Sequence, residues 1–103
     1  MIEKYYNEKD EVGVIVSPGY GAGFSTWASN KEICFDKEFI ELILKNDEEG
    51  LVRLKEEKYP DDYFEYRDLK VEFVPKGTIF EISEYDGSEY LRIISFPQDF
   101  LIA

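Results

Sequence analysis

The glycine-rich segment from Ser17 to Trp27 holds the residues best suited to bind a ligand. Glycines stand at positions 19, 21 and 23, and glycine permits both positive φ and close approach of another group to the main chain. Consecutive amides in such a loop form a nest for an anion, and neighbouring aromatic rings can stack a base. We predict a ligand-binding loop made of the following residues: Ser17, Gly19, Tyr20, Gly21, Gly23, Phe24, Ser25, Thr26 and Trp27. The alternative is a tight turn at Pro18-Gly19 whose aromatic side chains pack on the core.

This segment matches neither of the common phosphate-binding motifs. A P-loop requires a lysine after its last glycine, and here Gly23 is followed by Phe24 and Ser25. A dinucleotide fingerprint requires a long helix directly after the glycines, whereas residues 27–31 are typical of a turn.

The residues available for catalysis are few. The chain has no histidine and one cysteine, Cys34, so it can build neither a histidine-based triad nor a Cys/His zinc site. Carboxylates, tyrosine, lysine or an oxygen-bound metal remain, but no carboxylate pair stands out. We therefore predict no catalytic residue, metal site or cofactor. Because Cys34 lies between Ile33 and Phe35, we predict a buried thiol rather than a reactive one.

The strong negative charge indicates what kind of partner the chain would bind. The net charge is −11, which disfavours binding to a nucleic-acid backbone and suits a basic protein partner or imitation of nucleic acid. Residues 36–68 carry twelve acidic against six basic residues, or −6 of that total. Mixed aromatic and acidic side chains favour protein recognition, so we predict that Asp61, Asp62, Tyr63 and Glu65 bind a partner. The alternative is a solvated acidic loop.

The elements that would position these residues follow from hydrophobic periodicity. Strands are predicted at residues 12–17, 31–35, 69–75, 78–85 and 90–96. Asp36 is expected to cap one helix that ends near Asn46, and residues 47–49 to begin a second that Pro60 ends. Asp86-Gly87 predicts a hairpin turn. The order favours a single α+β domain over 1–103, with a mostly antiparallel sheet and two helices on one face.

Length and composition place the chain among small folded domains. No apolar run approaches the ~20 residues that cross a bilayer, and the N-terminal residues lack the apolar core of a signal peptide. We therefore expect a cytoplasmic protein that does not bind membranes.

Two stretches resemble a family of small bacteriophage-encoded proteins. Residues 14–27 match its strand followed by a Ser/Thr-Gly-aromatic-Gly-Ala-Gly-aromatic-Ser-Thr-Trp segment, with Pro18 as an insertion. A second match runs over residues 73–78 and 84–89, and residues 35–37 add to it. The resemblance implies a phage origin and a small non-enzymatic protein that interferes with host defence.

Three functions are consistent with these features. The leading hypothesis is a counter-defence binding protein whose glycine-rich loop sequesters a nucleotide-like ligand. In one version of this hypothesis, a second copy of the chain in a homo-oligomer completes the pocket. The main alternative is an acidic inhibitor that docks on a basic surface of a host defence protein. An enzyme using carboxylates is the least supported.

Overall fold

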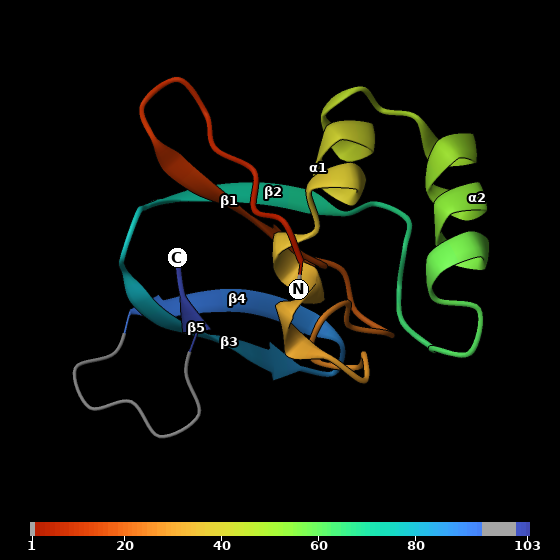
Figure 1. Ribbon diagram of the computed structural model, residues 1–103. Coiled ribbons are helices and arrows are strands. Elements are labelled where there is room, and N and C mark those ends of the chain that lie inside the picture. The colour runs from red at the N-terminus through yellow and green to blue at the C-terminus, as the bar shows by residue number, and fades with distance from the viewer. Residues whose placement is uncertain (1, 94–100) are drawn as a thin grey trace.

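The computed structural model describes residues 2–93 and 101–103, which form a single α+β domain (Figure 1). The elements in chain order are β1 (Glu11–Val16), the 3-10 helix η1 (Lys31–Phe35), α1 (Lys37–Leu44), α2 (Glu48–Lys58), β2 (Lys70–Pro75), β3 (Ile79–Tyr85), β4 (Ser88–Ile93) and β5 (Leu101–Ile102). Antiparallel pairing gives a two-stranded sheet, β1–β2, and a three-stranded sheet in the order β4–β3–β5. The predicted fold class is confirmed, with the strands divided between two sheets.

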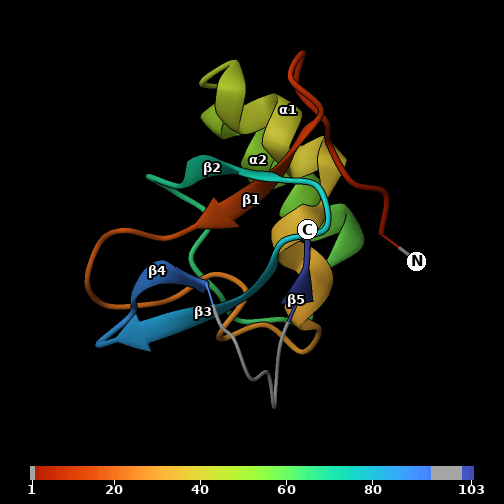
Figure 2. The same ribbon diagram turned by 90° about the vertical axis from the view of Figure 1, so that its left-hand side faces the viewer.

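Strand β1 is buried on both faces, as its apolar sequence predicted. Val12 and Val14 face the second sheet, where they pack in one core cluster with Phe80. Ile15 belongs to a second cluster that includes Ile40 of α1. The β1–β2 sheet therefore lies between the helices and the β4–β3–β5 sheet, and its strand β1 leads directly into the glycine-rich loop (Figures 1 and 2).

The predicted strand at residues 31–35 is wrong, because this segment is the 3-10 helix η1. The side chain of Asn30 accepts a hydrogen bond from the amide of Glu32, which closes the first turn locally. Ile33, Cys34 and Phe35 are consecutive and all buried, a pattern that an alternating strand on one face of a sheet does not produce.

Both predicted helices are present: α1 begins after the predicted cap Asp36, and α2 begins within the predicted segment 47–49, with Asp47 as its cap. Asp36 accepts hydrogen bonds from the amides of Glu38 and Phe39, and Asp47 accepts one from Gly50. Helix α1 ends at Leu44, shortly before the left-handed Asn46, and α2 ends at Lys58, shortly before Pro60.

Asp36 also joins the start of α1 to the end of α2. Its buried carboxylate accepts hydrogen bonds from Lys58 Nζ at 2.8 Å and from the hydroxyl of Tyr59 at 2.7 Å. Burial and the bond to Asp36 raise the pKa of Tyr59. Burial lowers the pKa of Lys58, but its bonds to Asp36 and Glu38 outweigh that effect and raise it. No buried side-chain oxygen or nitrogen of this cluster lacks a hydrogen-bond partner, so it links the two helices without an unsatisfied buried group.

The β4–β3–β5 sheet contains the predicted hairpin. Asp86 and Gly87 both have positive φ, as the tight turn requires, and β3 pairs with β4 from Phe80–Ile93 to Tyr85–Ser88. Of the strand predicted at residues 90–96, the part after residue 93 lies outside the described residues.

Candidate functional site

The glycine-rich loop folds around the carboxylate of Glu89. This side chain is 3% exposed and accepts four hydrogen bonds from the loop. The amide of Ser17 donates to Oε1 at 2.9 Å, and the amides of Phe24 and Thr26 donate to Oε2 at 2.8 and 3.0 Å. The Thr26 hydroxyl donates to the same oxygen at 2.5 Å. The loop is therefore a nest for an anion, and the chain supplies that anion itself.

Two glycines are required for this close packing. A Cβ on Gly23 would lie 2.8 Å from Trp27 Cδ1, 2.9 Å from Glu89 Oε2 and closer still to Thr26 Oγ1. A Cβ on Gly87 would lie 2.6 Å from the backbone of Gly21. By contrast, a Cβ on Gly19 would meet nothing within 4 Å. Glycine at 23 is thus a matter of space, whereas at 87 both the contact with the loop and the positive φ of the turn favour it.

The loop also covers the outer edge of β4 at its start (Figure 2). The Ser17 carbonyl accepts the amide of Glu89 at 2.7 Å, and the Pro18 carbonyl accepts the Ser88 hydroxyl at 3.0 Å. At the hairpin tip, the Gly21 amide donates to the Asp86 carbonyl at 2.8 Å. The bond from the Glu89 amide satisfies a main-chain group of β4 that would otherwise be open to pairing with another strand.

Sequence reasoning missed Glu89, although a signal was present. Glu89 alternates in phase with Leu91, which packs against the core, so the pattern places a carboxylate on the inward face of a strand. A charged residue in that position requires hydrogen-bond donors facing it. The three loop amides are those donors, so in this structure they are not available to a ligand.

The predicted loop side chains divide between the core and the surface. Phe24 is fully buried, with its ring centroid 5.0 Å from that of Phe64 and 5.7 Å from that of Phe39. Ser25 is buried as well. Tyr20 is 75% exposed at the loop tip and Trp27 is 40% exposed. Of the predicted aromatic surfaces, Tyr20 and Trp27 alone face solvent.

The second predicted segment lies directly against the loop. The amide of Glu65 donates to the Gly23 carbonyl at 2.9 Å, and Ser29 donates its hydroxyl proton to Asp62 Oδ1. The rings of Trp27 and Tyr63 lie 6.0 Å apart between their centroids, at 33° to one another. Tyr63 is 76% exposed. The structure thus joins two segments that the sequence presented as separate candidates.

We call the exposed part of this junction the Trp27–Tyr63 surface and define it as Trp27, Ser29, Asp61, Asp62 and Tyr63. Glu65, predicted with this set, lies beside it and uses its carboxylate to accept the amides of Tyr66 and Arg67. Its side chain therefore shapes the segment's own backbone.

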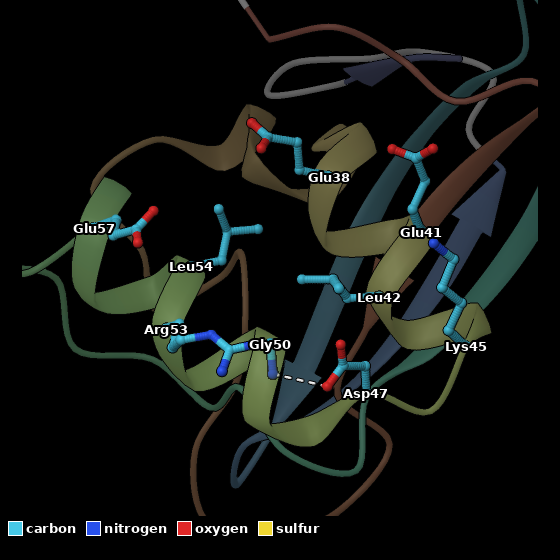
Figure 3. Close-up of a pocket in the computed structure, with 9 residues that line it drawn as sticks. All are labelled: Glu38, Glu41, Leu42, Lys45, Asp47, Gly50, Arg53, Leu54 and Glu57. Carbon is cyan, nitrogen blue, oxygen red and sulfur yellow. Dashed lines mark hydrogen bonds between the residues drawn. The ribbon is translucent and has the colours of Figure 1, made fainter.

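A groove of about 330 Å³ between α1 and α2 is the second surface feature (Figure 3). Leu42 and Leu54 point toward each other across it, and its rim carries acidic and basic side chains: Glu38, Glu41, Lys45, Asp47, Arg53 and Glu57. Asp47 caps α2 from within the groove, and Glu38 is ion-paired with Lys58 at 2.9 Å. The groove is thus partly occupied by helix-stabilising contacts.

Cys34 is buried, as predicted. Burial raises the pKa of its thiol, and the charges of Glu89 and Glu32 raise it further. We expect no reaction with a thiol reagent at pH 8 in native buffer and full reaction in denaturant, because the thiolate is the reactive form. Colorimetric thiol titration measures this, and rapid labelling of the native protein would contradict it.

Neither a metal cluster nor a membrane-spanning helix occurs in the described part of the chain. Residues 2–93 and 101–103 contain no group of three or more Cys, Asp or Glu side chains that could hold a metal ion. No helix among them is long and apolar enough to cross a bilayer.

Fold and site together define a small α+β domain with an internally filled anion nest and an exposed aromatic–acidic surface. Comparison with known protein families, curated proteins and solved structures finds no match. The resemblance to phage-encoded proteins stays a prediction.

Proposed function

We propose that this protein is a non-enzymatic binding protein that docks on a basic protein through the Trp27–Tyr63 surface. The observation that carries the proposal is the contact between the two candidate segments, which places exposed rings of Trp27 and Tyr63 beside Asp61 and Asp62. Aromatic side chains anchor interfaces, and negative charge steers a basic partner toward them. The resemblance to phage proteins makes a host defence protein the proposed partner class.

The residues next to this surface in the chain are held by hydrogen bonds or burial, which supports the proposal. Trp27 follows Thr26, whose amide and hydroxyl are both fixed by Glu89, and Tyr63 precedes the buried Phe64. A surface that is already ordered loses little conformational entropy on binding.

Charge reversal tests the proposal. Asp61→Lys with Asp62→Lys is expected to abolish capture of a basic bacterial protein from lysate, whereas Glu8→Lys with Glu56→Lys, equal in charge, should preserve it. Capture by the wild type should also fall from 0.1 M to 1 M salt, where the screening length drops from about 10 Å to about 3 Å. Equal losses in the two double variants, or salt-independent capture, would count against this function.

Nucleotide sequestration is the second candidate, and one observation favours it. The loop tip is open, since a Cβ on Gly19 would meet nothing within 4 Å and Tyr20 is 75% exposed. Because Glu89 occupies the nest amides, a ligand would bind at this tip or between two copies of the chain. Native mass spectrometry of the purified protein is the test. A nucleotide-sized adduct on a defined oligomer would support sequestration, and a bare monomer would contradict it.

A further inference from the structure

We infer that the Trp27–Tyr63 surface is a receptor for an arginine side chain of the partner. This inference rests on the proposed function and names the chemical group that the surface recognises. The indole ring of Trp27 offers the strongest face for a cation, and the carboxylates beside it offer acceptors for a planar guanidinium.

The two aromatic rings are placed to hold a flat cation. Their centroids lie 6.0 Å apart and their planes are inclined by 33°, so the two rings lie next to each other at this junction. Trp27 is 40% and Tyr63 76% exposed, which leaves ring surface open to an incoming group. A guanidinium stacks on such a surface better than an ammonium does, because it is planar and more weakly hydrated.

The cation–π contacts of the described residues involve other rings. They use five rings, those of Tyr6, Phe35, Tyr59, Phe64 and Tyr66. The ring next to Tyr63 in the sequence, Phe64, is buried and has the ammonium group of Lys55 over it. The exposed faces of Trp27 and Tyr63 are therefore open to a cation from outside.

The neighbouring carboxylates supply the complementary charge. Ser29 donates to one oxygen of Asp62, Oδ1, which ties this side chain to the segment that follows Trp27 and leaves Oδ2 without a hydrogen bond from the described residues. Asp61 is exposed beside it. An arginine stacked on the rings therefore has carboxylate oxygens within the same short segment. A charge-assisted bond adds to stacking and favours arginine over an uncharged group of the same shape.

The test uses Trp27 as its own reporter, since it is the single tryptophan of the chain. The probes are acetyl-Gly-Arg-Gly-amide and the same peptide with citrulline, the uncharged isostere, or with lysine. We expect the arginine peptide to change Trp27 fluorescence saturably, the lysine peptide to bind more weakly, and the citrulline peptide to leave it unchanged. Equal responses to the arginine and citrulline peptides would overturn the inference.

A matched pair of variants locates the site. Tyr63→Ala is expected to weaken binding of the arginine peptide about fivefold, the effect of losing one exposed cation–π contact. Tyr85→Ala removes another strongly exposed tyrosine, 74% exposed at the end of β3, and should leave binding unchanged. Equal effects of the two variants would overturn the inference as well.

The outcomes also separate this inference from the proposed function. If the charge-reversed surface loses its basic partner but Trp27 does not distinguish arginine from citrulline, docking stands and arginine recognition fails. If arginine binds at Trp27 but charge reversal at Asp61 and Asp62 leaves partner capture unchanged, the proposed function fails.

Discussion

Replacing Glu89 with alanine is expected to lower the free energy of unfolding by about 4 kcal/mol, since each buried donor left unsatisfied costs about 1–3 kcal/mol. The substitution removes the acceptor of four hydrogen bonds, three of them from main-chain amides that have no other partner among the described residues. The Thr26 hydroxyl can rotate to a new acceptor, but the amides cannot. Urea unfolding followed by circular dichroism measures the change.

The cross-strand neighbour of Glu89 provides the matched control. Glu84 pairs with Glu89 across the hairpin but is exposed, and within the described part of the chain its carboxylate accepts one hydrogen bond, from the amide of Gly87. Glu84→Ala leaves a single part-buried donor, the Gly87 amide, without its acceptor and should therefore cost about 1 kcal/mol, well below the cost of Glu89→Ala. Glu89→Gln keeps one acceptor oxygen, so its loss of unfolding free energy should lie between those of Glu89→Ala and Glu84→Ala. If Glu89→Ala lowered the free energy of unfolding no more than Glu84→Ala does, the Glu89 carboxylate would not be the group that stabilises the loop.

Gly23→Ala is expected to cost about 2–3 kcal/mol, the upper part of the range of about 1–3 kcal/mol for overpacking a closely packed site. The added methyl group would meet Trp27 Cδ1 at 2.8 Å and Glu89 Oε2 at 2.9 Å. Neither neighbour can withdraw freely, because Glu89 is held by four bonds and Trp27 packs against Tyr63. Chemical denaturation gives the energy, and altered Trp27 fluorescence would report the displaced ring.

Gly19→Ala is the control for this substitution. Gly19 lies in the same loop, has no neighbour within 4 Å of a Cβ and does not have positive φ. Its replacement should leave stability unchanged or raise it by a few tenths of a kcal/mol, because alanine restricts the unfolded chain. Equal costs at positions 19 and 23 would show that loop flexibility, and not contact with Glu89, requires glycine.

Locally encoded features were predictable from the sequence. The caps Asp36 and Asp47 bond amides two or three residues away, and the Asp86-Gly87 turn depends on its own two residues. The segment at 31–35 shows the limit of this reasoning. Its apolar residues favoured a strand, but a turn closed by Asn30 and burial of three consecutive side chains decided its conformation.

The candidate site depended on contacts between distant segments. The loop and the segment at 61–65 were each recognisable from composition, because glycines, aromatics and acids cluster there. Their contact is fixed by long-range packing of Phe24 on Phe64, which no local pattern encodes. The role of Glu89 was equally hidden, since strand alternation shows which way it points but not which amides it meets.

The long sequence separation between Glu89 and its hydrogen-bond donors determines when the loop can fold during translation. Ser17 and Glu89 are 72 positions apart, and Phe24 and Glu89 are 65 apart. A ribosome therefore releases β1 and the glycine-rich loop long before their anchor emerges, although nascent domains otherwise fold from the N-terminal side. On a translating chain the loop amides remain hydrated until residue 89 leaves the exit tunnel. Protease sensitivity of the loop in chains arrested before and after that point would follow this step.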